Sequence, residues 1–217
     1  MSDAGLCDLH CHYLPAIDDG VRTRDEGHAL CRGLAQLGYT TVVATPHMRP
    51  GMFDNERQQL TAAYAAFVEE LPQGMPETGL GAENFCDDVF FERFARGEAL
   101  LYPGGHAVLI EFPTERLPLR VDERFFHLQV RGVRPVLAHP ERYSPLWKDD
   151  QPLRTLTERG TLALLDVMAL VGKYGKRPQR TAEAWLDEGL YYAACTDSHR
   201  PNDLELVGEA IDRKSVV

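Results

Sequence analysis

The chain has 217 residues, which suffices for one large domain, or at most two small ones, and for a core that needs no disulfide staples. Its net charge of −10 argues against a general nucleic-acid-binding surface, because such surfaces are usually basic. No apolar run reaches the length of a membrane span, and residues 1–4 lack the basic and apolar regions of a signal peptide. We therefore expect a cytoplasmic protein without membrane insertion.

The five cysteines predict neither a disulfide framework nor a zinc knuckle, because their number is odd and no pair has the spacing of a zinc site. None is followed by an arginine six positions later, which removes the signature of the cysteine-dependent phosphatases. We expect Cys11 and Cys195 to be small packing residues. His28, His106 and His127 receive no functional role.

Short apolar runs alternate with runs of helical period along the chain. The predicted strands are Leu6–Tyr13, Thr40–Thr45, Gly79–Phe85, Ala107–Phe112, Arg134–Ala138, Leu162–Val167 and Tyr191–Thr196. The predicted helices are Arg24–Leu37, Asn55–Leu71, Asp87–Arg96, Val121–Val130, Leu153–Arg159 and Arg180–Glu188. This alternation predicts right-handed crossovers and a parallel α/β sheet, but periodicity does not tell whether the sheet closes into a barrel.

The first chemical motif is His10-Cys11-His12, at the end of the first predicted strand. Residues two apart in a strand point to the same side, so His10 and His12 can be ligands of one ion. Two unrelated histidines near a strand end would give the same pattern, so this motif alone does not distinguish a metal site from chance.

Further candidate ligands follow the carboxyl ends of the predicted strands, where sites in parallel α/β folds collect. They are Asp18, Asp19, His47, Glu83, Glu111, His139, Asp197 and His199. Turn formation explains Asp18 and Asp19, which precede Gly20. It does not explain Glu83 or Glu111, which continue apolar runs and would need a compensating cation. Histidines and carboxylates without thiolates suit manganese, iron or zinc, and the number of donors predicts two or three ions.

The segment Asp8–Gly20 resembles the opening motif of the bacterial PHP-type (polymerase and histidinol phosphatase) protein-tyrosine phosphatases. These manganese-dependent enzymes accompany the tyrosine kinases of capsule and exopolysaccharide synthesis. Further segments match in the family's order: Ala44–His47, Gly51–Phe53, Gly81–Glu83, Leu109–Phe112, Ala138–Tyr143 and Thr196–His199.

The resemblance implies a single domain over residues 1–217, with a distorted TIM-like (β/α)7 barrel and three divalent ions, Mn²⁺ in the first place and Fe or Zn as alternatives. By it, the first ion is held by His10, His12, Glu83 and Asp197. The second is held by Glu83, Glu111 and His139, with Glu83 bridging. The third is held by Asp19, His47 and His199. Arg142 and Arg49 match basic positions near the substrate phosphate, and the implied catalytic set is Arg142, Arg49, His12 and Asp197.

Three segments depart from the family's pattern. Leu164-Leu165-Asp166 stands where members often have Gln-Val-Asn. We interpret Asp166 as a satisfied strand-end aspartate, with an extra acceptor at the site as the alternative. The segment Asn84–Asp88 is unusual, and the end at Val217 predicts a truncated closing helix. These departures leave the ligand positions filled and bear on substrate preference and oligomer contacts.

The function implied is hydrolysis of phosphotyrosine, on a bacterial tyrosine autokinase that controls polysaccharide synthesis. Metal-activated water would attack in line, Arg142 would bind the phosphate in a bidentate way, and no covalent phosphoenzyme would form. A small-molecule phosphatase, such as one for histidinol phosphate, is the alternative with the same metals. A nuclease is disfavoured by the acidic balance, and a non-catalytic binding module by the filled ligand positions. The basic run Lys173–Arg180 is interpreted as a solvated charge run, with a loop for an acidic phosphopeptide as the alternative.

Overall fold

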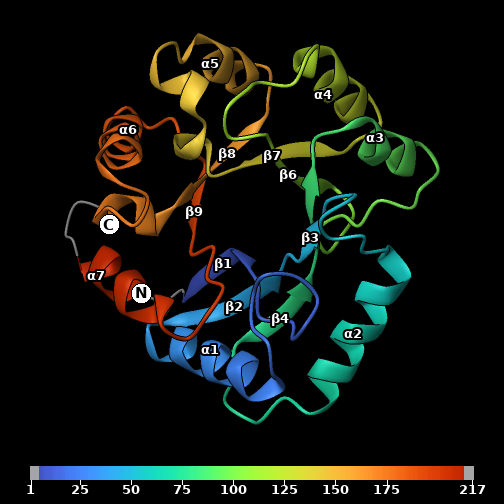
Figure 1. The fold of residues 1–217 in the computed structure, drawn as a ribbon, viewed down its shortest axis with the longest axis vertical. Helices are drawn as coiled ribbons and strands as arrows, with labels where there is room; N and C mark the ends of the chain where they lie inside the picture. Colours follow the sequence, from blue (N-terminus) through green and yellow to red (C-terminus); the bar gives the residue numbers. More distant parts are fainter. Residues whose placement is uncertain (1–4, 213–217) are drawn as a thin grey trace.

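A computed structural model describes residues 5–212, in which parallel strands alternate with helices (Figure 1). The strands are β1 (Leu6–Cys11), β2 (Tyr39–Ala44), β3 (His47–Met48), β4 (Glu77–Leu80), β5 (Glu83–Phe85), β6 (Ala107–Glu111), β7 (Arg134–Ala138), β8 (Leu162–Asp166) and β9 (Ala193–Cys195). The α-helices are α1 (Arg24–Gln36), α2 (Arg57–Glu69), α3 (Asp88–Ala95), α4 (Val121–Val130), α5 (Gln151–Glu158), α6 (Lys176–Asp187) and α7 (Asp203–Asp212). Three short 3₁₀ segments lie between them: η1 (Pro140–Arg142), η2 (Ser144–Trp147) and η3 (Val167–Val171).

The strands form two hydrogen-bonded sheets, in the orders β1-β2-β4 and β3-β5-β6-β7-β8-β9. The consecutive strands β2 and β3 form one strand position with a break in the middle, and so do β4 and β5, because β2 pairs with β4 and β3 pairs with β5. The first break lies at Thr45–Pro46, because proline has no N–H to donate to the ladder. The second lies at Gly81–Ala82, and it divides the predicted strand Gly79–Phe85. Seven strand positions therefore remain, as the sequence predicts.

The ring closes between β1 and the end of β9. Cys11 bridges Ser198, and the Asp197 N–H donates to the His10 carbonyl oxygen at 2.9 Å. The buried Asp8 carboxylate joins the same two segments, since it accepts from the Thr196 N–H at 2.9 Å and from the Thr196 hydroxyl at 2.6 Å. Figure 1 shows the resulting ring of strands with the helices outside it. The predicted α/β barrel is confirmed.

The helices cover the ring because each presents an apolar face to it. In α1, Leu30, Cys31 and Leu34 are buried, and the helix begins with a capping box in which Thr23 and Glu26 bond each other's backbone N–H. A separate cluster fills the inside of the barrel, made of Val43, Tyr102, Leu109, Val136, Ala138, Leu164 and Cys195.

Two helices differ from the sequence prediction. Helix α6 begins at Lys176, before the predicted Arg180, so residues 176–180 of the basic run interpreted as a solvated charge run are helical. Helix α7 was not predicted, and it packs against α1 and η3. The expectations for residues 1–4 and for the chain end at Val217 concern residues outside the described range.

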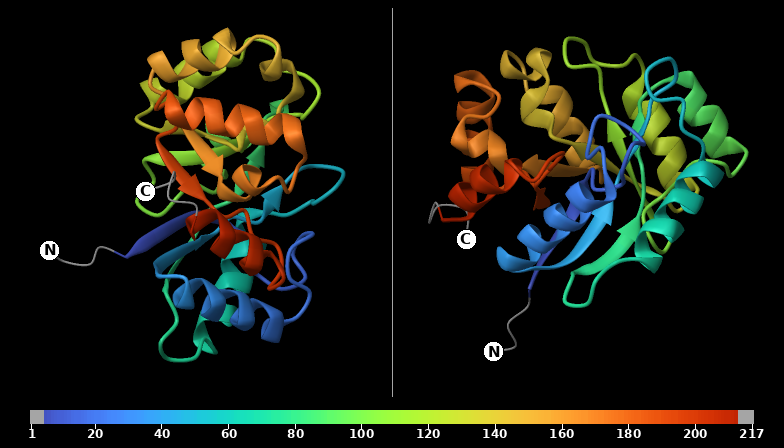
Figure 2. Two further views of the ribbon diagram at one scale, coloured as in Figure 1. Left: turned by 90° about the vertical axis from the view of Figure 1, so that its left-hand side faces the viewer. Right: turned by 60° about the horizontal axis from the view of Figure 1, so that its bottom comes forward.

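The two ends of the barrel differ in character. In the left view of Figure 2, the loops that follow β1 and β3 project on the side opposite the start of β1. The amino-terminal end instead opens into a largely apolar cavity of about 890 Å³, whose lining includes Cys7, Thr41 and Arg134 but none of the predicted ligands. Among residues 5–212, no helix is both long and apolar enough to cross a bilayer.

Candidate metal centre

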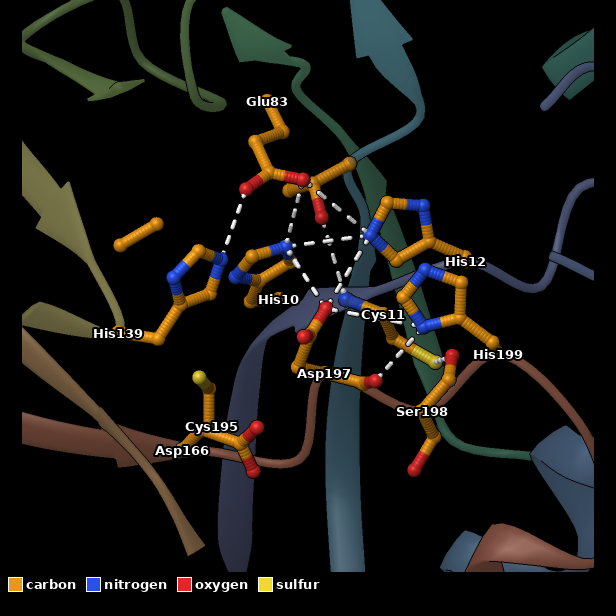
Figure 3. Close-up of polar contacts among 12 residues, drawn as sticks. His10, Cys11, His12, Glu83, His139, Asp166, Cys195, Asp197, Ser198 and His199 are labelled. Atoms are coloured by element: carbon orange, nitrogen blue, oxygen red, sulfur yellow. Dashed lines mark hydrogen bonds and ion pairs between the residues drawn. The ribbon is translucent and has the colours of Figure 1, made fainter. Parts of the chain in front are cut away.

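The predicted ligands converge at the carboxyl end of the barrel. Figure 3 shows His10, His12, Glu83, His139, Asp197 and His199 among them. Their donor atoms form three groups, in each of which all atoms lie within 4.8 Å of one another. The central group is His10, His12, Glu83 and Asp197. The Glu111 group is His47, Glu83 and Glu111. The Asp19 group is His12, Asp19, His47 and His199.

The first predicted set matches the central group, and the third is contained in the Asp19 group. The second differs in one member, since His47 rather than His139 stands with Glu83 and Glu111. His139 lies beside them, with its Nε2 3.0 Å from Glu83 Oε1. The assignment of His139 to an ion stays a prediction.

The strand ends aim these side chains inward through unusual backbone conformations. His139 and Asp197, which follow β7 and β9, have φ of 31° and 46°. Positive φ is uncommon for residues other than glycine, and such conformations cluster at functional sites, where the surrounding structure holds them. The short β9 and the closure with β1 fix the backbone on both sides of Asp197.

The donor atoms face one another without ordinary hydrogen-bond partners. His10 Nε2 lies 3.1 Å from His12 Nε2 and 3.1 Å from Asp197 Oδ1. Asp197 Oδ1, Glu111 Oε2 and His47 Nδ1 are buried and make no contact of hydrogen-bond geometry among the described residues, although His47 Nδ1 lies 3.0 Å from Glu83 Oε2. Buried polar atoms without hydrogen bonds are costly, and a cation coordinated by them removes the cost. The donor set fits divalent metal ions.

Charge in the cluster is balanced by protons on the histidines. Burial alone would raise the pKa of Glu83, but the neighbouring His47 and His10 hold it well below its usual range. Burial would lower the pKa of His47, but Glu83 and Asp19 raise it to about 12. Burial and the charge of Glu83 together raise the pKa of Glu111 to about 7. A divalent cation would take over the role of these protons, because a metal site needs neutral imidazoles and ionised carboxylates.

Asp18 has a role that the sequence reasoning missed. Its Oδ2 lies 2.8 Å from His12 Nδ1 and accepts from the His47 N–H at 3.0 Å, while its Oδ1 accepts from the Gly20 N–H, as in a turn. A carboxylate on the far nitrogen of a ligand histidine fixes the ring and its tautomer. The sequence placed Asp18 among the candidate ligands and explained it by turn formation before Gly20, and no pattern in it indicated the contacts with His12 and His47.

Two arginines flank the donor groups, each between a carboxylate and an aromatic ring. Arg142 Nη1 lies 2.5 Å from Asp197 Oδ2, and its guanidinium stands 4.5 Å from the centre of the Tyr174 ring. Arg49 Nη1 lies 3.8 Å from Glu111 Oε2, and its guanidinium stands 4.2 Å from the centre of the Phe85 ring. Both side chains are partly exposed, so they are available to a ligand above the cluster.

The residues expected to have no functional role lie outside the donor groups. Cys11 and Cys195 are fully buried, as predicted, and their sulfurs lie against the backbone carbonyl oxygens of Ser198 and Leu165. None of His28, His106 and His127 joins a donor group within the described chain.

A match to a protein-family model shows the family of this chain. The model named "Capsular polysaccharide synthesis, CpsB/CapC" matches residues 6–205. The chain belongs to the CpsB/CapC family. Tyrosine-protein phosphatase YwqE of Bacillus subtilis (strain 168) is 29% identical to it over 196 residues, which cover 89% of this chain and 77% of that protein. Tyrosine-protein phosphatase CpsB of Streptococcus pneumoniae is 24% identical over 221 residues, which cover 96% of this chain and 90% of that protein.

Solved structures agree with this placement in the CpsB/CapC family. One of them superposes on this chain with a TM-score of 0.86. It comes from a study of YwqE from Bacillus subtilis and CpsB from Streptococcus pneumoniae, which are called there unique metal-dependent tyrosine phosphatases. It is 25% identical, and the match covers 98% of this chain and 88% of that one. A D-hydantoinase superposes with a TM-score of 0.52 at 12% identity, over 98% of this chain and 67% of its own, which shows a likeness of fold alone.

Proposed function

We propose that this protein is a metal-dependent protein-tyrosine phosphatase that hydrolyses phosphotyrosine in a protein substrate. The observation that carries the proposal is the convergence of three histidine–carboxylate groups beside the Arg142 guanidinium. Membership of the CpsB/CapC family and the names of its relatives, which are tyrosine-protein phosphatases, support it.

The proposed cofactors are three divalent ions, Mn²⁺ in the first place and Fe or Zn as alternatives. The residues that would hold them are those of the three donor groups, together with His139. When bound, such ions lower the pKa of a coordinated water and offset the charge of the phosphate.

The chain's own residues supply orientation and charge around the phosphate. Asp197 fixes one end of the Arg142 guanidinium, and we assign to Arg142 the binding of phosphate oxygens, in the bidentate way that lysine cannot copy. Arg49 would act from the Glu111 side, while His12 is oriented by Asp18. The leaving group is a phenolate, whose conjugate acid has a pKa of about 10, so it can leave with little help from a general acid. No covalent phosphoenzyme is involved.

For the physiological substrate we propose a bacterial tyrosine autokinase in the cytoplasm that controls polysaccharide synthesis. The description of the family, capsular polysaccharide synthesis, supports this partner. The test is dephosphorylation of the purified, autophosphorylated kinase, with loss of antiphosphotyrosine signal as the readout. A kinase that keeps its phosphotyrosine while a phosphotyrosine peptide is hydrolysed would remove the partner and keep the activity.

The activity is tested by phosphate release from a phosphotyrosine peptide. We expect activity with Mn²⁺, its loss with a chelator and its recovery on adding Mn²⁺. Arg142→Ala should lower kcat/KM by about 10²–10³-fold, the effect of removing one donor to transition-state charge. Arg159→Ala is the control, because Arg159 pairs with Asp122 on the outer helices. Full activity in metal-stripped protein, or faster hydrolysis of histidinol phosphate than of the peptide, would contradict the proposal.

A further inference from the structure

The Arg142 guanidinium is held from three directions. Its Nη1 contacts Asp197 Oδ2 at 2.5 Å and lies 3.8 Å from Asp166 Oδ2. The Tyr174 ring covers one face, at 4.5 Å from the guanidinium carbon. Among the hydrogen bonds of residues 5–212, those of Arg142 side-chain donors involve Nη1 only. The edge formed by Nε and Nη2 therefore has no protein acceptor within the described chain.

Of the two carboxylates beside Arg142, Asp166 has the more unusual surroundings. It ends β8 with a fully buried side chain, on the Asp197 side of the cluster and away from Glu83 (Figure 3). Its Oδ1 accepts from the Met168 N–H at 2.9 Å, but its buried Oδ2 has no hydrogen-bond partner among the described residues. A buried, unpaired carboxylate oxygen needs a nearby positive charge, and Arg142 is the arginine that lies beside it.

Tyr174 reaches Arg142 from a tight turn after η3. Gly172 and Gly175 flank it with φ of 84° and 93°, and the Gly175 N–H donates to the Gly172 carbonyl oxygen at 3.0 Å. Lys173 anchors the turn through its ion pair with Asp203 at 2.9 Å. The Tyr174 ring and the Asp166 carboxylate both lie beside the Arg142 guanidinium, so together they form one support for the arginine.

We propose that Asp166 and Tyr174 are positioning residues for Arg142, which together turn the Nε–Nη2 edge of its guanidinium toward the substrate phosphate. This inference rests on the proposed function, in which Arg142 binds that phosphate. Nη1 is fixed by Asp197 and Asp166, and the ring blocks rotation out of the plane. A planar fork offers two parallel donors only when its plane is held, and a phosphate has the matching pair of oxygens.

The test measures binding of inorganic phosphate to the Mn²⁺-loaded protein by calorimetry, and steady-state hydrolysis of a phosphotyrosine peptide. Asp166→Asn removes the charge, Tyr174→Leu removes the ring, and Tyr174→Phe keeps the ring without the hydroxyl. We expect the first two to raise the Kd for phosphate and the KM by about 5- to 10-fold, the size of a charge or cation–π contact at a partly buried site. Tyr174→Phe should have a smaller effect than Tyr174→Leu.

A double-mutant cycle separates positioning from a merely structural role. In the Arg142→Ala background, Asp166→Asn and Tyr174→Leu should leave the Kd for phosphate unchanged, because the residue through which they act is gone. Equal fold-changes in both backgrounds, or single variants that bind phosphate like the wild type, would overturn the proposal. So would a fall in bound Mn²⁺ in either single variant, since the effect would then pass through the metals.

Phosphate binding is an equilibrium measurement, so it separates this inference from the proposed function. If the wild type binds phosphate and the cycle shows coupling, the positioning role stands even where phosphotyrosine is not hydrolysed. If phosphotyrosine is hydrolysed but the cycle shows no coupling, the proposed function stands and the positioning role falls. Tyr174 is partly exposed on a turn, so its variants test the idea should Asp166→Asn fail to fold.

Discussion

A carboxylate outside the donor groups, Asp18, fixes the geometry of two histidines inside them. It bonds the far nitrogen of the His12 ring and the backbone N–H of His47, so both donors depend on one side chain. His199 is fixed in a similar way, since its Nδ1 lies 2.9 Å from the Asp197 carbonyl oxygen and its Nε2 faces Asp19. Histidines held in this way present a defined nitrogen to a metal ion.

Asp18→Ala should therefore weaken metal binding without removing a donor. We expect the affinity for Mn²⁺ to fall by about 10- to 100-fold, the usual effect of losing a hydrogen-bonding partner of a ligand histidine. Calorimetric titration of metal-free protein with Mn²⁺ measures it. Asp187→Ala, at the exposed end of α6, is the matched control. An unchanged affinity in Asp18→Ala would mean that the ring is held by other contacts.

The protonation of the cluster gives a second prediction. In the metal-free protein, neighbouring carboxylates raise the pKa of His47 to about 12 and that of His199 to about 9, although burial opposes both shifts. Both rings are then protonated at pH 7, whereas a metal ligand must be a neutral imidazole. Loading with Mn²⁺ at pH 7 should release about two protons or more per protein. The affinity should fall as the pH falls, because protons compete for the same nitrogens.

Titrations in buffers of different ionisation enthalpy measure this release directly. His127→Gln is the control, because His127 lies on α4, outside the donor groups. Binding that releases no protons would show that the histidines are already neutral in the metal-free protein.

At the scale of elements, two helical glycines predict opposite responses to the same substitution. A Cβ at Gly27, in α1, would lie 2.6 Å from the Tyr13 carbonyl oxygen and 2.7 Å from the Phe67 ring. A Cβ at Gly208, in α7, would lie 3.4 Å from Leu37 Cδ2, an ordinary contact. Gly27 thus allows α1 to approach the backbone just after β1, the strand that carries His10 and is followed by His12.

Gly27→Ala should destabilise the protein by about 1–3 kcal/mol, the cost of overpacking, in spite of the better helix propensity of alanine. Gly208→Ala should be neutral or stabilising by up to about 1 kcal/mol, because the propensity gain meets no clash. Urea unfolding of both variants compares them. If Gly27→Ala were as stable as Gly208→Ala, the approach of α1 to Tyr13 would have to be looser than the structure has it.

The sequence predicted the strand positions well and their breaks poorly, for physical reasons. Apolar runs such as Val108–Ile110 indicate a buried strand wherever it pairs. By contrast, β4 begins at Glu77 and includes Gly79, which have little strand propensity, and it exists through its pairing with β2. The early start of α6 was missed because it contains Pro178, which is tolerated in a first turn.

The candidate site, too, could be predicted from the sequence only in part. The phase of the ligands relative to the strand ends is visible in the sequence, so His10, Glu83 and Asp197 could be placed together beforehand. The contacts of Asp18 and Tyr174 join side chains across separate loops, and no local pattern records such a meeting. The sequence therefore predicts the candidate metal ligands but not the residues that orient them.

At the scale of the whole molecule, the candidate metal centre and the exposed cysteine lie at opposite ends of the barrel. Cys7 is exposed at the start of β1, beside the cavity at the amino-terminal end, while the other four cysteines are buried. Burial raises the pKa of Cys31 and of Cys86 to about 12, and it raises the pKa of Cys11 and Cys195 well above the ordinary value. These four thiols are protonated and covered at pH 8, so they should not react in the folded protein.

A thiol-specific disulfide reagent should therefore modify one cysteine in the native protein at pH 8, and five after denaturation. Because Cys7 lies at the opposite end of the barrel from the donor groups, its modification should leave the hydrolysis of phosphotyrosine peptide unchanged. A Cys7→Ser variant, which should show no fast-reacting thiol and full activity, is the control. Loss of activity in step with modification would place a cysteine in the reaction, which contradicts a hydrolysis carried by histidines, carboxylates and bound metals.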